Sequence, residues 1–150
     1  MKRKKILFVC TGNTCRSPMA EMIMRAKIKQ HKIKWWDVVS CGVHAQLKDT
    51  IAPNAALALE KCGYCVRRNF APRQLTQKLI ESSEVVITMT TSHKQMLEGC
   101  GNVISVKDLC GFDVPDPYGA GVEVYMRTCE AIACACDKII EKYILTDKEN

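Results

Sequence analysis

Four short apolar runs are separated along the chain by longer segments in which apolar residues recur every three or four positions. The runs are rich in Val and Ile and do not alternate cleanly with polar residues, which is typical of strands covered on both faces. The pattern therefore predicts four buried strands, at Lys5–Cys10, Val38–Cys41, Val85–Met89 and Val103–Val106.

The segments between these runs predict helices. Ser17 is expected to be the N-cap of a helix that has Pro18 at its first position and continues to about Gln30. Ser92 and Gln95 form a capping box, which predicts another helix start. Further helices are expected at Pro53–Lys61, at Leu75–Glu81, from Ser92 to about Gly99, and along a final stripe of Tyr125, Cys129, Ile132, Cys136, Ile139 and Tyr143.

Strands that alternate with helices imply right-handed crossovers and a parallel sheet. At 150 residues the chain has the length of one domain. We therefore expect a single α/β domain over residues 1–150, with a four-stranded open parallel sheet and helices on both faces. Ligand sites in such sheets lie at the carboxyl ends of the strands, which is where Cys10 falls.

Composition narrows the class of protein. No apolar run approaches the roughly 20 residues of a membrane helix, and the run after the basic start is too short for a signal peptide. The ten cysteines are then interpreted as reduced thiols of a cytoplasmic protein. The net charge of +6 comes from dispersed basic residues without interleaved aromatic residues, which favours anionic substrates over nucleic acid. We expect no membrane partner.

The segment between the first strand and the first helix carries the chemistry. Cys10 is followed after five residues by Arg16 and then by Ser17. Such a turn can curl so that successive N–H groups, helped by the helix N-terminus, bind a phosphate or another oxyanion. Gly12 permits a tight backbone path, and Asn13 can brace the loop. The expected phosphate-binding residues are Thr11, Gly12, Asn13, Thr14, Cys15, Arg16 and Ser17.

Three side chains in this loop suit phosphoryl transfer. The planar fork of Arg16 can bind two phosphate oxygens and gains strength as charge develops there. The same positive field favours the thiolate of Cys10, which is its nucleophilic form. The Ser17 hydroxyl can donate to that sulfur and make it a better leaving group in a second step.

This loop, together with Asp116-Pro117 late in the chain, resembles the low-molecular-weight protein-tyrosine-phosphatase family. The resemblance covers most of the chain, including the turn at residues 40–42 and residues 92–95. It implies that Cys10 is the nucleophile, Arg16 the phosphate binder and Asp116 the general acid. It also implies a reversible disulfide between Cys10 and Cys15, and a cleft wall formed by Tyr118, which could instead anchor the acid loop by packing.

The role of Asp116 also follows from the chemistry, because the leaving group needs a proton and the phosphocysteine then needs an activated water. Pro115 and Pro117 restrict the loop around this carboxyl group. Asp113 is a competing acid without flanking prolines. One departure from the family lies at residues 69–75, because many members carry a histidine before the Arg-x-Leu sequence that follows the second helix and this segment has none.

Neither a metal nor a cofactor is expected. Cys62 with Cys65, and Cys134 with Cys136, could suggest zinc, but the second pair lies within a helix at a spacing that points the two sulfurs apart. These cysteines are interpreted as core residues. The three histidines show no metal-ligand spacing, so surface or hydrogen-bonded roles are expected for them.

The substrate has two candidate chemistries. The string at residues 10–21 resembles the protein-arginine-phosphatase branch of the family, and the hydroxyl of Thr11 could accept a hydrogen bond from a guanidinium leaving group. Phosphoarginine in proteins is therefore favoured, with phosphotyrosine as the alternative. Arsenate reduction and non-catalytic phosphate binding are more distant alternatives. The expected assembly is a monomer or a weak homodimer.

Overall fold

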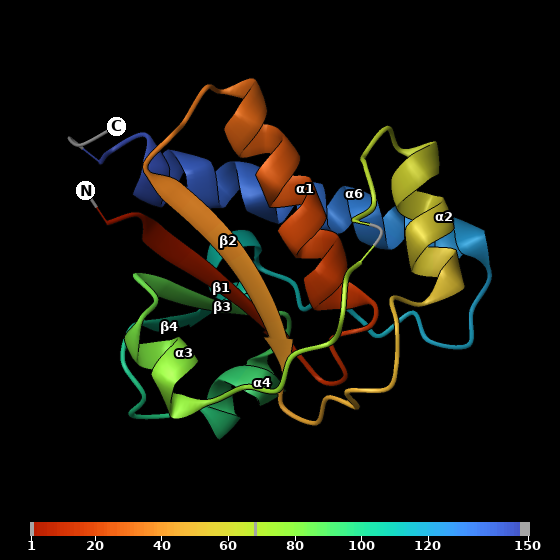
Figure 1. Ribbon diagram of the computed structural model, residues 1–150, viewed down its shortest axis with the longest axis horizontal. Helices are drawn as coiled ribbons and strands as arrows, with labels where there is room; N and C mark the ends of the chain where they lie inside the picture. Colours follow the sequence, from red (N-terminus) through yellow and green to blue (C-terminus); the bar gives the residue numbers. More distant parts are fainter. Residues whose placement is uncertain (1, 68, 148–150) are drawn as a thin grey trace.

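The computed structural model describes residues 2–67 and 69–147 and contains a four-stranded sheet in the order β2-β1-β3-β4 (Figure 1). The central strand β1 (Lys4–Cys10) pairs in parallel with β2 (Trp36–Gly42) and with β3 (Val85–Thr88), and β4 (Val103–Ser105) pairs in parallel with β3. The predicted open parallel sheet is confirmed.

Helices cover both faces of this sheet. On one face lie α1 (Arg16–Gln30), α2 (Pro53–Lys61) and α6 (Val122–Ile139), and on the other lie α3 (Gln77–Glu81) and α4 (Thr91–Met96). Strand residues alternate between two apolar clusters, with Ile6 and Phe8 in the first and Leu7 and Val9 in the second. Both sides of β1 are thus buried, which explains why its sequence shows no polar alternation.

The start of α1 differs from the sequence prediction. Ser17 is not its N-cap, because the helix begins at Arg16 with Cys15 in the cap position and without a side-chain cap hydrogen bond. Ser17 is instead fully buried, and its hydroxyl lies 2.8 Å from the sulfur of Cys10. Pro18 consequently occupies the third helical position, where a missing N–H still costs no intrahelical hydrogen bond.

Two other predicted helix starts also differ in the structure. The prediction of a capping box at Ser92 and Gln95 is wrong, because the Thr90 hydroxyl accepts from the N–H of His93 and α4 begins at Thr91. Thr76 caps α3, which therefore begins at Gln77 and not at Leu75. Ser105 ends β4 and forms a capping box with Asp108 that starts an unpredicted helix, α5 (Val106–Cys110).

The apolar stripe of the final helix is buried from Tyr125 to Ile139, as predicted. The chain then continues as a π-helical segment, η1 (Ile140–Ile144), in which Tyr143 is only half-buried. The interpretation of the paired cysteines as core residues holds for Cys136, which is fully buried, but is wrong for Cys65 and Cys134, which are exposed.

The end of β2 lies directly against the loop that follows β1. A Cβ atom added to Gly42 would collide with the carbonyl oxygen of Thr11 and would lie 2.8 Å from the nitrogen of Asn13. Both neighbours are backbone atoms, so they cannot rotate away as a side chain could. Gly42 therefore allows the strand and the loop to approach each other.

We expect Gly42→Ala to lower the free energy of unfolding by about 1–3 kcal/mol, because the loop backbone has to move. Gly121→Ala is the matched control, since an added Cβ there meets nothing within 4 Å. Urea denaturation of both variants checks this expectation. Equal stability of the two variants would contradict the close approach.

Candidate active site

A pocket of about 180 Å³ lies at the carboxyl end of β1 and the start of α1. The loop that joins these elements, residues 10–17, is called the phosphate loop below. The pocket brings this loop together with two residues from a distant part of the chain. Its lining residues are Cys10, Thr11, Gly12, Thr14, Cys15, Arg16, Asp116 and Tyr118.

The backbone of the phosphate loop retains its hydrogen-bond donors. Within residues 2–67 and 69–147, none of the N–H groups of residues 12–17 donates to a protein atom. Six donors beside a helix N-terminus form a favourable environment for an anion. Oxyanion binding by this loop stays a prediction.

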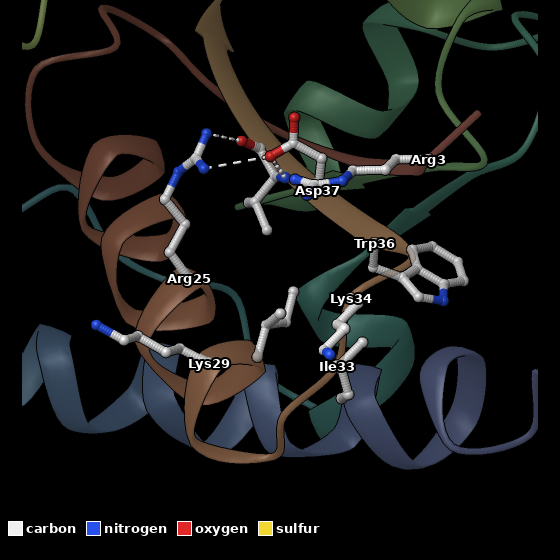
Figure 2. Close-up of a pocket in the computed structure, with 9 residues that line it drawn as sticks. Arg3, Arg25, Lys29, Ile33, Lys34, Trp36 and Asp37 are labelled. Carbon is white, nitrogen blue, oxygen red and sulfur yellow. Dashed lines mark hydrogen bonds and ion pairs between the residues drawn. The ribbon is translucent and has the colours of Figure 1, made fainter. Parts of the chain in front are cut away.

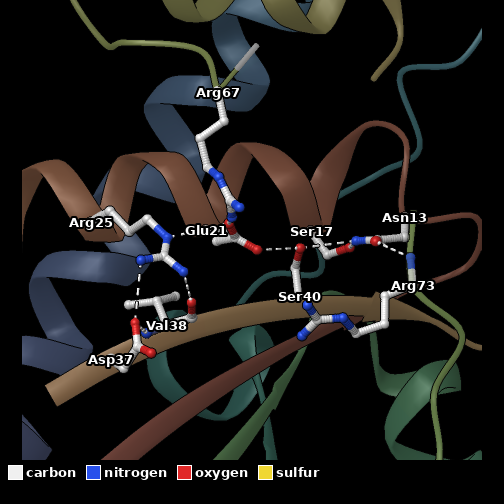
Figure 3. Close-up of polar contacts among 9 residues, drawn as sticks. All are labelled: Asn13, Ser17, Glu21, Arg25, Asp37, Val38, Ser40, Arg67 and Arg73. Atoms are coloured by element: carbon white, nitrogen blue, oxygen red, sulfur yellow. Dashed lines mark hydrogen bonds and ion pairs between the residues drawn. The ribbon is translucent and has the colours of Figure 1, made fainter. Parts of the chain in front are cut away.

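Asn13 is the brace of the loop. It is fully buried and adopts a positive φ of 56°, whereas Gly12 does not use the left-handed region. Its side-chain amide donates to Ser17 Oγ at 2.8 Å and to Ser40 Oγ at 3.0 Å, and its Oδ1 accepts from the N–H of Arg73 at 2.8 Å (Figure 3). These three hydrogen bonds hold the backbone of Asn13 in its left-handed conformation.

Arg16 reaches the pocket from the first turn of α1 and is nearly buried. Its Nη1 donates to the carbonyl oxygen of Val114 at 3.1 Å, and its Nη2 lies 3.8 Å from Oδ2 of Asp116. The guanidinium group is therefore held by the loop that carries the candidate acid. This contact couples the two halves of the pocket.

The two candidate acids differ in their surroundings. Oδ1 of Asp113 accepts hydrogen bonds from the N–H and the hydroxyl of Thr91, at 2.9 and 3.0 Å, so this carboxylate holds the start of α4. Asp116 lines the pocket and is exposed, and its Oδ1 accepts the N–H of Tyr118 at 3.1 Å. Tyr118 lines the same pocket and is 80% exposed, and its role as a cleft wall stays a prediction.

His93 is a pocket neighbour that the sequence did not assign to the site. Its Nε2 lies 2.9 Å from the hydroxyl of Thr11, and its Nδ1 lies 3.0 Å from that of Thr90. Burial, reinforced by the charge of Arg16, lowers its pKa from 6.5 to about 4. The imidazole is therefore neutral near pH 7. A hydrogen-bonded role was expected, but its position beside the phosphate loop depends on tertiary structure.

Cys15 is buried behind the loop, and its sulfur lies 3.5 Å from the hydroxyl of Tyr125. Burial is the main reason why the pKa of its thiol is raised, so it is a poorer nucleophile than an exposed cysteine. Both Cys10 and Cys15 are free thiols in this structure. The disulfide implied by the family resemblance therefore stays a prediction.

A larger pocket, of about 310 Å³, lies at the opposite end of the sheet (Figure 2). It is lined by cationic side chains that include Arg3, Arg25 and Lys29, and by the indole of Trp36. Its lining contains no cysteine, serine or histidine that could attack phosphorus. The smaller pocket at Cys10 is therefore the candidate for chemistry.

Within residues 2–67 and 69–147, no three His, Cys, Asp or Glu side chains gather where they could hold a metal ion. Nor does any described helix combine the length and the apolar character needed to cross a bilayer.

Comparison with known proteins identifies the class. The family model for low molecular weight phosphotyrosine protein phosphatases matches residues 5–149. A protein-arginine-phosphatase of Bacillus subtilis (strain 168) is 35% identical over 131 residues, covering 82% of this chain and 85% of the relative. The low molecular weight protein-tyrosine-phosphatase PtpB of Staphylococcus aureus is 32% identical over 139 residues, covering 85% and 91%.

A solved structure shows the same fold in a related enzyme. It is a cysteine-to-serine mutant of the arginine phosphatase YwlE with a phosphorylated active-site serine. Its TM-score is 0.88 at 30% sequence identity, and the match covers 97% of this chain and 98% of that chain.

The chain belongs to the low molecular weight phosphotyrosine protein phosphatase family. It is accordingly a cysteine-dependent protein phosphatase, and the family resemblance seen in the sequence is confirmed. Relatives of similar identity are named for phosphoarginine and for phosphotyrosine. The choice between these substrates therefore depends on the pocket.

The lowered pKa of His93 predicts a pH-dependent contribution to stability. Between pH 4 and 6.5, His93 is protonated in the unfolded chain and neutral in the folded protein. The free energy of unfolding therefore falls as the pH drops through this window. Above pH 7 the contribution is constant.

We expect wild type to lose stability relative to His93→Gln between pH 6.5 and pH 4. Urea denaturation of both proteins at intervals from pH 4 to 8 measures the difference. Parallel curves over the whole range would show that His93 is not held neutral.

Proposed function

We propose that the protein hydrolyses phosphoarginine in proteins through a phosphocysteine at Cys10. The observation that carries the catalytic part is the pocket in which a cysteine, an arginine and an aspartate meet beside six unused N–H donors. The related YwlE mutant, which has phosphate on its active-site serine, supports a phosphoenzyme intermediate by analogy. Phosphorylated proteins are the proposed partners, and inorganic phosphate is expected to occupy the same loop.

The first step transfers the phosphoryl group to sulfur. The thiolate of Cys10 attacks phosphorus while the N–H groups and Arg16 bind the phosphate oxygens. The bond from phosphorus to the leaving nitrogen or oxygen breaks, and Asp116 donates its proton to that atom. Cys10 then carries the phosphate, and Asp116 is a carboxylate.

The second step returns the enzyme to its starting state. Asp116 accepts a proton from a water molecule, which attacks phosphorus as the bond to sulfur breaks. The departing sulfur of Cys10 lies 2.8 Å from the Ser17 hydroxyl, which can donate to the thiolate as it forms. Phosphate is released, and Asp116 is again protonated.

The substrate preference depends on the two threonines that line the pocket. The hydroxyl of Thr11 is engaged by His93 at 2.9 Å and faces Nη2 of Arg16 at 3.5 Å, which weakens the expectation that it contacts the leaving group. Within residues 2–67 and 69–147, the hydroxyl of Thr14 has a single hydrogen-bond contact, with the sulfur of Cys15 at 3.8 Å. We therefore propose that Thr14 is the hydroxyl available to a polar guanidinium group.

We expect Asp116→Asn to lower kcat by roughly 10²–10⁴ for phosphoarginine peptides, whose leaving group needs a proton. The loss should be smaller for an aryl phosphate with an acidic phenol. Asp113→Asn is the matched control, because its carboxylate holds α4 and not the pocket. An equal loss for all leaving groups would show that Asp116 acts later or only shapes its loop.

We expect Thr14→Ile to shift the ratio of kcat/KM from phosphoarginine toward phosphotyrosine by about 1–3 kcal/mol, because it removes an acceptor and adds apolar bulk. Thr11→Ile should instead lower kcat/KM for both substrates, since it removes the partner of His93. The measurement compares both phosphopeptides in wild type and both variants. A wild type that prefers phosphotyrosine would return that substrate to first place.

A further inference from the structure

A buried carboxylate lies at the far end of the hydrogen bonds that fix Asn13. Glu21, on α1, is 3% exposed. Its Oε1 accepts from Ser40 Oγ at 2.9 Å. Its Oε2 accepts from Arg25 Nε at 3.2 Å and from Arg67 Nη1 at 2.6 Å. Figure 3 shows these side chains as one connected group between α1 and β2.

We propose that Glu21 is a positioning residue of the phosphate loop, whose carboxylate fixes the direction of the hydrogen bonds that run through Ser40 and Asn13 to Ser17. This inference rests on the proposed roles of Cys10 and Ser17. Glu21 itself contacts neither the sulfur nor the pocket, so it acts through the intervening residues.

The donor and the acceptor of each hydrogen bond follow from the protons that each group has to donate, beginning at the carboxylate of Glu21. An ionised carboxylate can only accept, so the single proton of the Ser40 hydroxyl goes to Glu21. The oxygen of Ser40 is then an acceptor for one amide proton of Asn13. Because the Nδ2 group faces Ser40, the Oδ1 atom faces the other way, toward the N–H of Arg73. The orientation of the amide is thereby determined.

The same assignment of protons extends from Asn13 through Ser17 to the proposed nucleophile, Cys10. The second amide proton of Asn13 goes to the oxygen of Ser17. Ser17 therefore keeps its own proton for either the sulfur of Cys10 at 2.8 Å or the carbonyl oxygen of Cys41 at 3.2 Å. When Cys10 is a thiolate, its negative charge and its shorter distance favour the sulfur over the neutral carbonyl oxygen, so the proton goes to the sulfur. The buried carboxylate thus helps to present a donor to the catalytic thiolate.

Two arginines supply the counter-charge that a buried carboxylate needs. Arg25 lies one turn after Glu21 on α1, and it also donates to Asp37 and to the carbonyl oxygen of Val38. Arg67 comes from the segment between α2 and α3, and its side chain is 46% exposed. A glutamine in place of Glu21 could not satisfy both sides, because its NH₂ group would face either these guanidinium groups or the Ser40 hydroxyl.

The test is Glu21→Gln, measured alone and combined with Ser17→Ala. We expect the single variant to lower kcat about tenfold or more, as for a lost charge-assisted hydrogen bond, with KM changed less than about threefold. Because Glu21 acts on the sulfur through Ser17, the double variant should be no slower than Ser17→Ala by more than about twofold. Losses that multiply in the double variant would overturn the inference.

Arg67→Met and Arg67→Lys form a second pair of variants, which should disturb folding less because the Arg67 side chain is half-exposed. We expect Arg67→Met to lower kcat, as Glu21→Gln does, and Arg67→Lys to retain most of the wild-type kcat. Asp137→Asn is the control on α6, because it removes a peripheral ion pair with Lys27 at 2.8 Å and should leave kcat unchanged. Wild-type kcat in both Glu21→Gln and Arg67→Met would contradict the proposed role.

A readout independent of turnover separates this inference from the proposed function. In NMR spectra, the side-chain amide signals of Asn13 should shift in Glu21→Gln and stay in place in Asp137→Asn. Unchanged Asn13 signals in Glu21→Gln would refute the positioning role even if the enzyme is active. Absence of turnover by wild type on either phosphopeptide, with the signals shifted as expected, would instead refute the proposed function alone.

Discussion

In the proposed function, the phosphate loop has to keep its N–H groups available for an anion while its own backbone stays fixed. These two demands conflict, because a loop is usually fixed by hydrogen bonds that its own backbone N–H groups donate. Here the conflict is resolved by side chains: Asn13 makes three buried hydrogen bonds, and Gly42 lets β2 approach the loop closely. In the part of the chain that the structure describes, no buried side-chain nitrogen or oxygen lacks a partner.

The same constraint explains the electrostatics of the pocket. The carbonyl oxygen of Val114 accepts a hydrogen bond from Arg16, which ties the guanidinium group to the loop that carries Asp116. His93 is kept neutral by burial and by Arg16, which leaves its ring as a hydrogen-bonding partner of Thr11 and not as a second cation. The positive charge at the pocket is thus that of the Arg16 guanidinium group.

Sequence alone predicted the four strands, both covered faces of the sheet and the position of the loop between the first strand and the first helix, because these depend on local pattern and fixed spacing. Details that depend on tertiary contacts were not predictable. Ser17 looks like a helix cap, yet it is drawn inward by Cys10 and Asn13. The place of His93 beside Thr11, and the burial of Glu21 behind Ser40, join residues that are far apart in the chain.

The most direct test of the account is the chemical state of Cys10 during turnover. Acid quenching within the first turnover, followed by mass spectrometry, should find phosphate on the peptide that carries Cys10 when either phosphopeptide is the substrate. Product formation with no phosphate on this peptide, or with phosphate on Cys15 instead, would contradict the central claim.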